Sequence, residues 1–214
     1  MTWVERAVER SPMVQRSRNR GMEQAQAIVL AARRLLAAKG TSFTTQELVK
    51  EAGVALQTFY RYFASKDQLL LAVFEDLISE FCDGLRSQVA EMKDPIERLR
   101  FCVTIAARPP DSDSAEVTAP RFITSEHWRL QQEYPAEIAV AISPFSDLLA
   151  EEIENAVRAG SLRSSDPESD AWHITQLVMA VFHHYAFAEV ERSSEEVAER
   201  LWQFCLSGLG GPRW

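Results

Sequence analysis

Histidine and cysteine are the residue types in this chain best suited to metal or redox chemistry, but their spacing supports neither. His173 and His184 share a helical face, yet three turns would separate them by about 16 Å. The adjacent side chains of His183 and His184 would point roughly 100° apart. The three cysteines (Cys82, Cys102 and Cys205) lack the close spacing of a metal or disulfide-exchange motif. Gly-rich phosphate loops and Gly-x-Ser-x-Gly turns are absent. We therefore expect no metal site, no cofactor and no enzymatic activity.

A second set of polar side chains could bind nucleic acid. It occupies residues 44–63, where two short helical patterns meet at Gly53. This is the layout of a helix-turn-helix, whose first helix crosses the phosphate backbone. Its second helix lies in the major groove, where the base edges present a readable pattern of donors and acceptors. Glycine permits the tight turn between them. Taken alone, the pattern also fits an ordinary helical bundle.

The charge of the chain is divided at the end of the same segment. The whole chain of 214 residues carries −8, which argues against a nucleic-acid binder. Residues 1–66, however, contain 11 Lys and Arg against 5 Asp and Glu, a net +6. The remaining residues carry −14. Such asymmetry indicates one surface that meets a polyanion and one that does not, although a short segment can also drift basic by chance.

Helical signals recur along the whole chain. From Met22 to Lys39 apolar residues are spaced three and four apart, and Gly40 ends the pattern. Capping boxes, or a proline in the first helical turn, mark later starts. These signals are Thr44–Glu47, Ser65–Gln68, Asp94–Pro95, Asp166–Pro167 and Ser193–Glu196. Further helices are expected at about 120–132 and 135–159, the second interrupted at Pro144, and a loop at 108–119. With no alternating strand pattern, we predict an all-α fold of eight to ten helices.

The chain has no feature of a membrane or secreted protein. Its longest apolar runs are six residues, whereas a membrane span needs roughly 20. The first residues contain no apolar signal segment. Three cysteines cannot all pair, which fits a reducing compartment. We expect a cytoplasmic protein with no membrane partner.

Residues 43–75 resemble the DNA-binding signature of the TetR family of transcriptional regulators. They read FTTQELVKEAGVALQTFYRYFASKDQLLLAVFE. The matching positions include Thr45, Leu48, Val49, Ala52, Gly53, Val54, Thr58, Phe59, Tyr60, Tyr62, Phe63, Ser65, Lys66 and Leu69. The resemblance covers about a quarter of the chain, and the remainder agrees in helix count and length.

Two positions depart from this signature. Ala55 stands where the family usually has Ser or Thr, so the second helix lacks a hydroxyl cap, a loss of about 1 kcal/mol. Gln57 stands where the family usually has a small residue. An amide side chain can bind adenine through two hydrogen bonds, so Gln57 could read a base.

The resemblance implies three segments. Residues 1–21 form a basic flexible arm, residues 22–66 a three-helix DNA-binding domain, and residues 67–210 a larger effector-binding and dimerisation domain. The residues expected to bind DNA are Thr44, Thr45, Leu56, Gln57, Thr58, Tyr60, Arg61, Tyr62, Lys66, Arg16, Arg18 and Arg20. Among these, Thr44, Thr45, Tyr60, Tyr62 and Lys66 would contact phosphates. The arm arginines would enter a minor groove, or would simply be solvated charges. Phe59 and Phe63 are expected to face inward.

The acidic part of the chain should bind a small-molecule effector and a second copy of itself. Residues 171–188 are apolar nearly all round. With the last helix they predict a homodimer interface, although burial in a monomer core is the alternative. Residues that could line an effector pocket are Phe101, Phe122, His127, Trp128, Phe145, Trp172, His183, His184 and Tyr185. Most of them could equally be core residues.

We interpret the chain as a ligand-responsive repressor. A homodimer would bind a palindromic operator in double-stranded DNA and be released by a small lipophilic or aromatic effector. One alternative is a helical ligand-binding protein with weak or lost DNA binding, which Ala55 and Gln57 favour. Another is an enzyme that uses the aromatic pocket.

Overall fold

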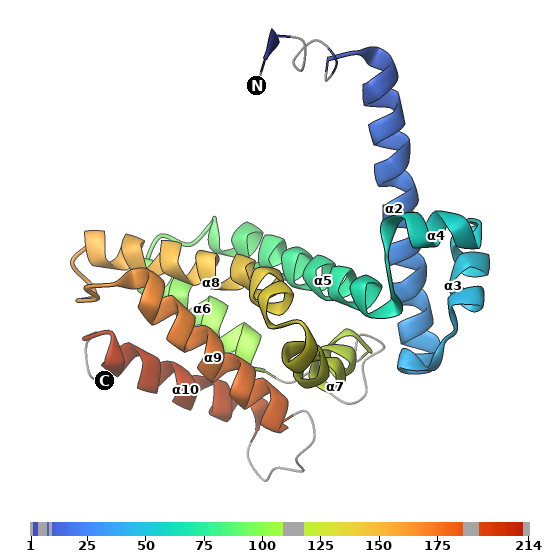
Figure 1. The fold of residues 1–214 in the computed structure, drawn as a ribbon. Coiled ribbons are helices and arrows are strands. Elements are labelled where there is room, and N and C mark those ends of the chain that lie inside the picture. Colours follow the sequence, from blue (N-terminus) through green and yellow to red (C-terminus); the bar gives the residue numbers. More distant parts are fainter. Residues whose placement is uncertain (1, 4–7, 9, 109–117, 186–192, 212–214) are drawn as a thin grey trace. The chain divides into compact units, whose positions relative to one another are not determined.

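A computed structural model describes residues 2–3, 8, 10–108, 118–185 and 193–211. Within these residues the fold is all-α, as predicted, with one short 3-10 helix and no strand (Figure 1). The helices are α2 (Pro12–Lys39), η1 (Gly40–Ser42), α3 (Thr45–Ala52), α4 (Leu56–Tyr62), α5 (Lys66–Val89), α6 (Pro95–Ala107), α7 (Thr118–Glu133), α8 (Pro135–Arg158), α9 (Pro167–Tyr185) and α10 (Ser194–Gly208). None of these helices is long and apolar enough to cross a membrane.

The chain divides into two compact units. An N-terminal unit spans Met1–Val73 and a C-terminal unit spans Phe74–Trp214. The division falls inside α5, which is a single continuous helix. In the N-terminal unit α2 packs against α3 and α4, and α3 packs against α4. Its buried apolar side chains include Ile28, Leu36, Phe43, Leu48, Phe59 and Leu69. A small core of this kind fixes the geometry of the two short helices.

The first long helix begins earlier than the sequence analysis predicted. It starts at Pro12, which occupies the first helical turn, so residues 12–21 are helical and not a flexible arm. Gly21, the last residue of the expected arm, lies within this helix. A Cβ at Gly21 would lie 3.3 Å from the hydroxyl oxygen of Tyr62, so the glycine permits a close approach within the unit.

The C-terminal unit is a bundle centred on α6 and α8. α8 packs on α6, α7 and α9, while α6 also packs on α9 and α10, and α9 and α10 lie side by side (Figure 1). α8 continues through Pro144, where an interruption was expected. Most of the expected loop at 108–119 lies outside the described residues.

A buried ion pair crosses the centre of this bundle. The Arg98 guanidinium on α6 lies 2.6 Å from the Glu152 carboxylate on α8, and Glu152 is 1% exposed. The pKa of Arg98 is raised, chiefly by this hydrogen bond. A charge as deeply buried as Glu152 depends on its partner, so the pair ties α6 to α8.

Candidate functional site

The start of α3 is a complete capping box, as its sequence predicted. The Thr44 hydroxyl accepts a hydrogen bond from the Glu47 amide (3.2 Å), and the Glu47 carboxylate accepts one from the Thr44 amide (2.8 Å). Hydrogen bonds from Lys39 and then from Thr44 lower the pKa of Glu47 to about 2. The Thr44 hydroxyl is therefore used in capping. Thr45, half-buried in the first turn, lies where the α3 amides could meet a phosphate.

Gly53 joins α3 to α4 in a left-handed conformation. Its φ and ψ are 66° and 29°, and its amide donates to the carbonyls of Lys50 and Val49. A residue with a side chain would be strained at this φ. The turn lets α4 follow α3 closely, which is the arrangement of a helix-turn-helix.

One face of α4 is open to solvent. Leu56, Gln57, Tyr60 and Arg61 are exposed, whereas Thr58 is half-buried. Phe59 on the opposite face is buried and stacks on half-buried Phe63, with ring centroids 5.9 Å apart, so both point inward as expected. Ala55 caps the helix without a side-chain hydrogen bond. The exposed face carries an amide, a phenol and a guanidinium, which can all bind DNA.

Arg61 and Tyr62 also bind within the protein. The Arg61 guanidinium donates to the Gln24 side chain (2.8 Å) and lies over the Tyr62 ring, 4.8 Å from its centroid. The Tyr62 hydroxyl donates to the same Gln24 oxygen (3.1 Å). These contacts fix the end of α4 against α2, close to Gly21.

Lys66 has a structural role that the sequence did not predict. Its ammonium donates to the main-chain carbonyls of Thr41 and Phe43 and lies 4.2 Å from the centre of the Phe43 ring. These contacts hold the segment that leads into α3. We therefore assign Lys66 to positioning that helix, and a direct phosphate contact remains only a prediction.

The basic residues of the expected arm lie on a helix. Arg16, Arg18 and Arg20 are exposed on the first turns of α2. An α-helix is about 10 Å wide and the minor groove about 6 Å, so a helical segment does not thread into that groove as an extended arm would. A phosphate contact by these arginines stays a prediction, with a solvated surface charge as the alternative.

Three of the predicted effector residues come together. The rings of His127 on α7 and His183 on α9 lie 4.7 Å apart, and Trp128 lies 5.8 Å from each. Phe74 on α5 stacks on His127, with ring centroids 5.9 Å apart. Both histidines are buried. Their own spacing gave no signal of this meeting, because two different helices bring them together.

The other predicted effector residues are dispersed. Phe145 packs near Phe81 on α5, with ring centroids 6.3 Å apart. Trp172 and His184 are exposed on α9. Phe122 is buried and Phe101 half-buried, while the side chain of Tyr185 lies outside the described residues. Periodicity gave the helical faces of these residues but not which faces meet.

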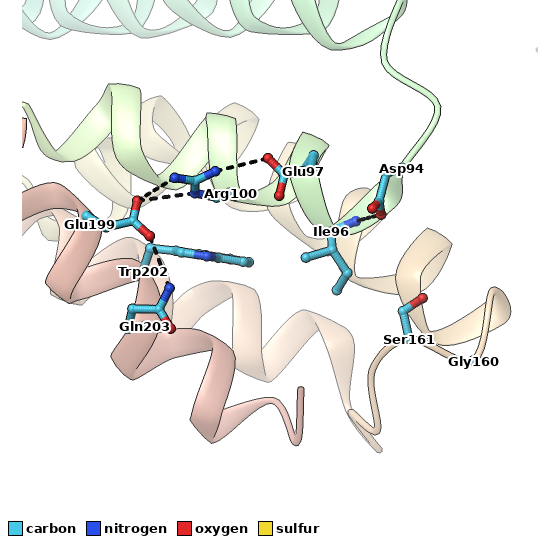
Figure 2. Close-up of a pocket in the computed structure, with 9 residues that line it drawn as sticks. All are labelled: Asp94, Ile96, Glu97, Arg100, Gly160, Ser161, Glu199, Trp202 and Gln203. Atoms are coloured by element: carbon cyan, nitrogen blue, oxygen red, sulfur yellow. Dashed lines mark hydrogen bonds and ion pairs between the residues drawn. The ribbon is translucent and has the colours of Figure 1, made fainter. Parts of the chain in front are cut away.

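A surface pocket of about 610 Å³ lies between α6 and α10, away from the predicted effector residues (Figure 2). Its only basic side chain, Arg100, already binds Glu97 and Glu199 at 3.1 and 3.0 Å. Trp202 forms part of its wall but is buried. Arg100, Glu97 and Glu199 of this pocket are therefore already paired with one another.

The described residues hold no group of three or more His, Cys, Asp or Glu that could bind a metal ion. Cys82, Cys102 and Cys205 are all buried and free. Burial raises the pKa of Cys82 to about 11 and that of Cys102 to about 12. Protonated thiols are poor metal ligands and poor nucleophiles.

Similarities to known proteins agree with this geometry. A model of bacterial regulatory proteins of the tetR family matches residues 28–73. The transcriptional regulator EthR of Mycolicibacterium smegmatis is 36% identical over 146 residues, 63% of this chain and 66% of EthR. The nucleoid occlusion factor SlmA of Haemophilus influenzae is 24% identical over 170 residues, 75% of this chain and 73% of SlmA.

A solved structure shares the fold beyond the matched segment. Thermus thermophilus FadR, a TetR-family repressor solved with lauroyl-CoA, aligns with a TM-score of 0.68 at 23% identity over 86% of this chain and 94% of FadR. Together with the helix-turn-helix and its exposed α4 face, these matches place the chain in the TetR family of bacterial transcriptional regulators, which bind DNA and are not enzymes.

Proposed function

We propose that this regulator is a repressor that binds a palindromic operator as a homodimer and is released by a small lipophilic or aromatic effector. The exposed face of α4 is the observation that carries the proposal. Gln57 would read bases in the major groove, while Tyr60 and the α3 N-terminus would contact phosphates. The net +6 of residues 1–66 would steer this unit to DNA.

Exposed apolar side chains on α9 and α10 support a homodimer. Trp172 and Leu177 on α9 and Phe204 on α10 are exposed in the single chain. Large apolar groups on two adjacent helices are typical of surfaces that a second copy covers. A two-fold dimer would also present two recognition helices to the two halves of a palindrome.

The effector would act through its preference for one conformation. A ligand bound to the C-terminal unit shifts the population towards the state that it binds better, and release follows if that state fits DNA poorly. The structural likeness to a repressor solved with lauroyl-CoA supports a lipophilic ligand. The buried aromatic cluster around His127 supports an aromatic one.

Selection of bound sequences from random DNA duplexes tests the proposal. We expect an inverted repeat whose affinity falls steeply with salt. The variant Gln57→Ala should lose roughly 10- to 100-fold of discrimination at one position of each half-site, because a base contact is lost. The matched variant Tyr60→Phe should weaken binding to all duplexes alike. Equal effects of both variants on every sequence would refute the role given to Gln57.

Ala55 leaves α4 without a side-chain cap, and Gln57 departs from the family signature. Both favour one alternative, a ligand-binding protein with weak DNA binding. Analytical sedimentation decides between the two. It measures whether the protein binds the duplex selected above, or a duplex from the DNA upstream of its own gene. An intact dimer with no salt-sensitive DNA binding would support the alternative and contradict the repressor.

A further inference from the structure

Two imidazoles in the C-terminal unit are buried without complete hydrogen bonding. His127 and His183 are each 8% exposed, and their rings lie 4.7 Å apart at an angle of 55°. Nδ1 of His127 and Nε2 of His183 have no hydrogen-bond partner in the described part of the chain. Buried polar atoms are nearly always paired, and leaving one unpaired destabilises the fold. Two such atoms on adjacent rings point to a group that they bind together.

Aromatic side chains surround the pair. Phe74 lies nearly parallel to His127, at 27° and 5.9 Å. Trp128 packs against both imidazoles and is 60% exposed, so it separates them from solvent on one side. Flat aromatic walls favour a flat ligand, and a displaced Trp128 would open the way to the pair.

The chemistry of the two rings limits the group that they can bind. Burial, and then the neighbouring His183, lowers the pKa of His127 to about 4, and burial lowers the pKa of His183 as well. Both rings are therefore neutral at pH 7. A neutral imidazole has one N–H donor and one acceptor nitrogen. Glu126, the neighbour of His127 in the sequence, already binds Arg129 at 2.8 Å.

A hydroxyl group matches two neutral imidazoles best. It can accept a hydrogen bond from one ring and donate one to the other, whereas a carboxylate is bound only when both unpaired nitrogens carry a hydrogen. A metal ion would need further ligands, and the described residues form no group of three His, Cys, Asp or Glu that could hold one.

We propose that His127 and His183 together bind the hydroxyl group of an aromatic effector whose ring lies against Phe74 and Trp128. This inference rests on the proposed effector response and names the ligand class. It makes the histidine pair a specificity determinant, because a ligand without the hydroxyl would leave both nitrogens unpaired.

Phenol and toluene are the matched probes, since a methyl group replaces the hydroxyl at nearly the same size. We expect phenol to bind about tenfold more tightly than toluene, measured by NMR and calorimetric titration of the full chain. The double variant His127→Phe/His183→Phe should bind the two probes equally. His184→Phe alters the exposed neighbour of His183 and should keep the preference. The single variants His127→Asn and His183→Gln retain a polar atom and should keep part of the preference for phenol over toluene.

Several outcomes would overturn the inference. They are equal binding of the two probes to the unaltered protein, binding of neither probe, or an unchanged preference in the double variant. Circular dichroism checks that each variant folds. If the double variant does not fold, the single variant His183→Phe decides, with loss of the preference expected and its retention contradictory.

A separate measurement distinguishes this inference from the proposed function. If the free protein binds its selected duplex but phenol and toluene bind alike, the inference fails and the repressor stands. If phenol binds through the histidines but no duplex is bound, the repressor fails and the site stands.

Discussion

The two units of this chain place their polar groups in opposite ways. In the N-terminal unit polar side chains lie at the surface, and the internal contacts of Thr44, Gln24 and Lys66 arrange the helices around an exposed α4 face. In the C-terminal unit several polar side chains are buried as well, among them Glu152, His127 and His183. All buried side-chain nitrogen and oxygen atoms without a partner, among the described residues, belong to this second unit: Arg98 Nε, Arg108 Nε, His127 Nδ1, Glu152 Oε2 and His183 Nε2.

This difference fits what each unit is proposed to recognise. DNA is large and polar, so it is met by a surface whose scaffold is already satisfied. A small molecule is enclosed, and the groups that fix it must be buried before it arrives. We therefore expect the loss of a polar side chain to destabilise the N-terminal unit less than the C-terminal unit. Three measurements test this contrast.

The largest expected effect comes from the ion pairs. Arg98→Met leaves Glu152 buried and unpaired, so we expect a loss of about 3 kcal/mol in the free energy of unfolding, measured with urea. The pair of Arg34 with Glu51 in the N-terminal unit is exposed on both sides, and Arg34→Met should cost less than about 1 kcal/mol. Similar losses of unfolding free energy in both variants would contradict the contrast between the two units.

Acid should weaken the C-terminal unit first. The folded pKa of His127 is about 4 against 6.5 in the unfolded chain, so the unfolded state binds more protons and stability falls as pH decreases from 6.5 towards 4. The expected loss is about 2 kcal/mol at pH 5 relative to pH 7. In the N-terminal unit the pKa of Glu47 is lowered from 4.5, so the stability that this carboxylate contributes is lost only as the pH falls below 4.5.

Urea unfolding at pH 7 and pH 5 measures this effect. His127→Phe should remove most of the difference between the two pH values, while His173→Phe, at an exposed position, should leave it in place. An unchanged pH dependence in His127→Phe would show that other groups cause the acid sensitivity.

The smallest expected effects are those of the two helix caps in the N-terminal unit. Thr44→Ala removes the cap of α3 and should cost about 1 kcal/mol. Ala55→Ser adds a hydroxyl at a residue that already has the extended backbone of an N-cap, so it should gain up to about 1 kcal/mol. Thermal unfolding compares the two, and effects of the same sign would contradict the capping account.

Local signals allowed much of the N-terminal unit to be predicted. The capping box at Thr44, the turn at Gly53 and the inward Phe59 each depend on a few neighbouring residues. The helical form of residues 12–21 was not predicted, and the place of Gly21 in it has a tertiary reason, namely the close approach of Tyr62. The structural role of Lys66 was also not predicted, since nothing in the local sequence reveals that its ammonium binds the carbonyls before α3.

The C-terminal unit was harder to predict because its contacts join distant helices. The aromatic content predicted a pocket, and the histidines at 127 and 183 were named for it. Which of the predicted residues meet depends on how α7 and α9 pack, and no spacing within either helix encodes that. The starts of α6 and α10 were predictable for the opposite reason, since Asp94 and Ser193 cap them locally.

The helical form of residues 12–21 gives the basic segment a fixed length and phase. At 1.5 Å per residue it spans about 15 Å, and Arg16 and Arg20, four residues apart, share one face of it. A flexible arm would absorb an inserted residue without consequence. Here an insertion after Arg20 would rotate both arginines by about 100° around the helix axis. The number of residues between these arginines and the rest of α2 therefore fixes the direction in which their charges point.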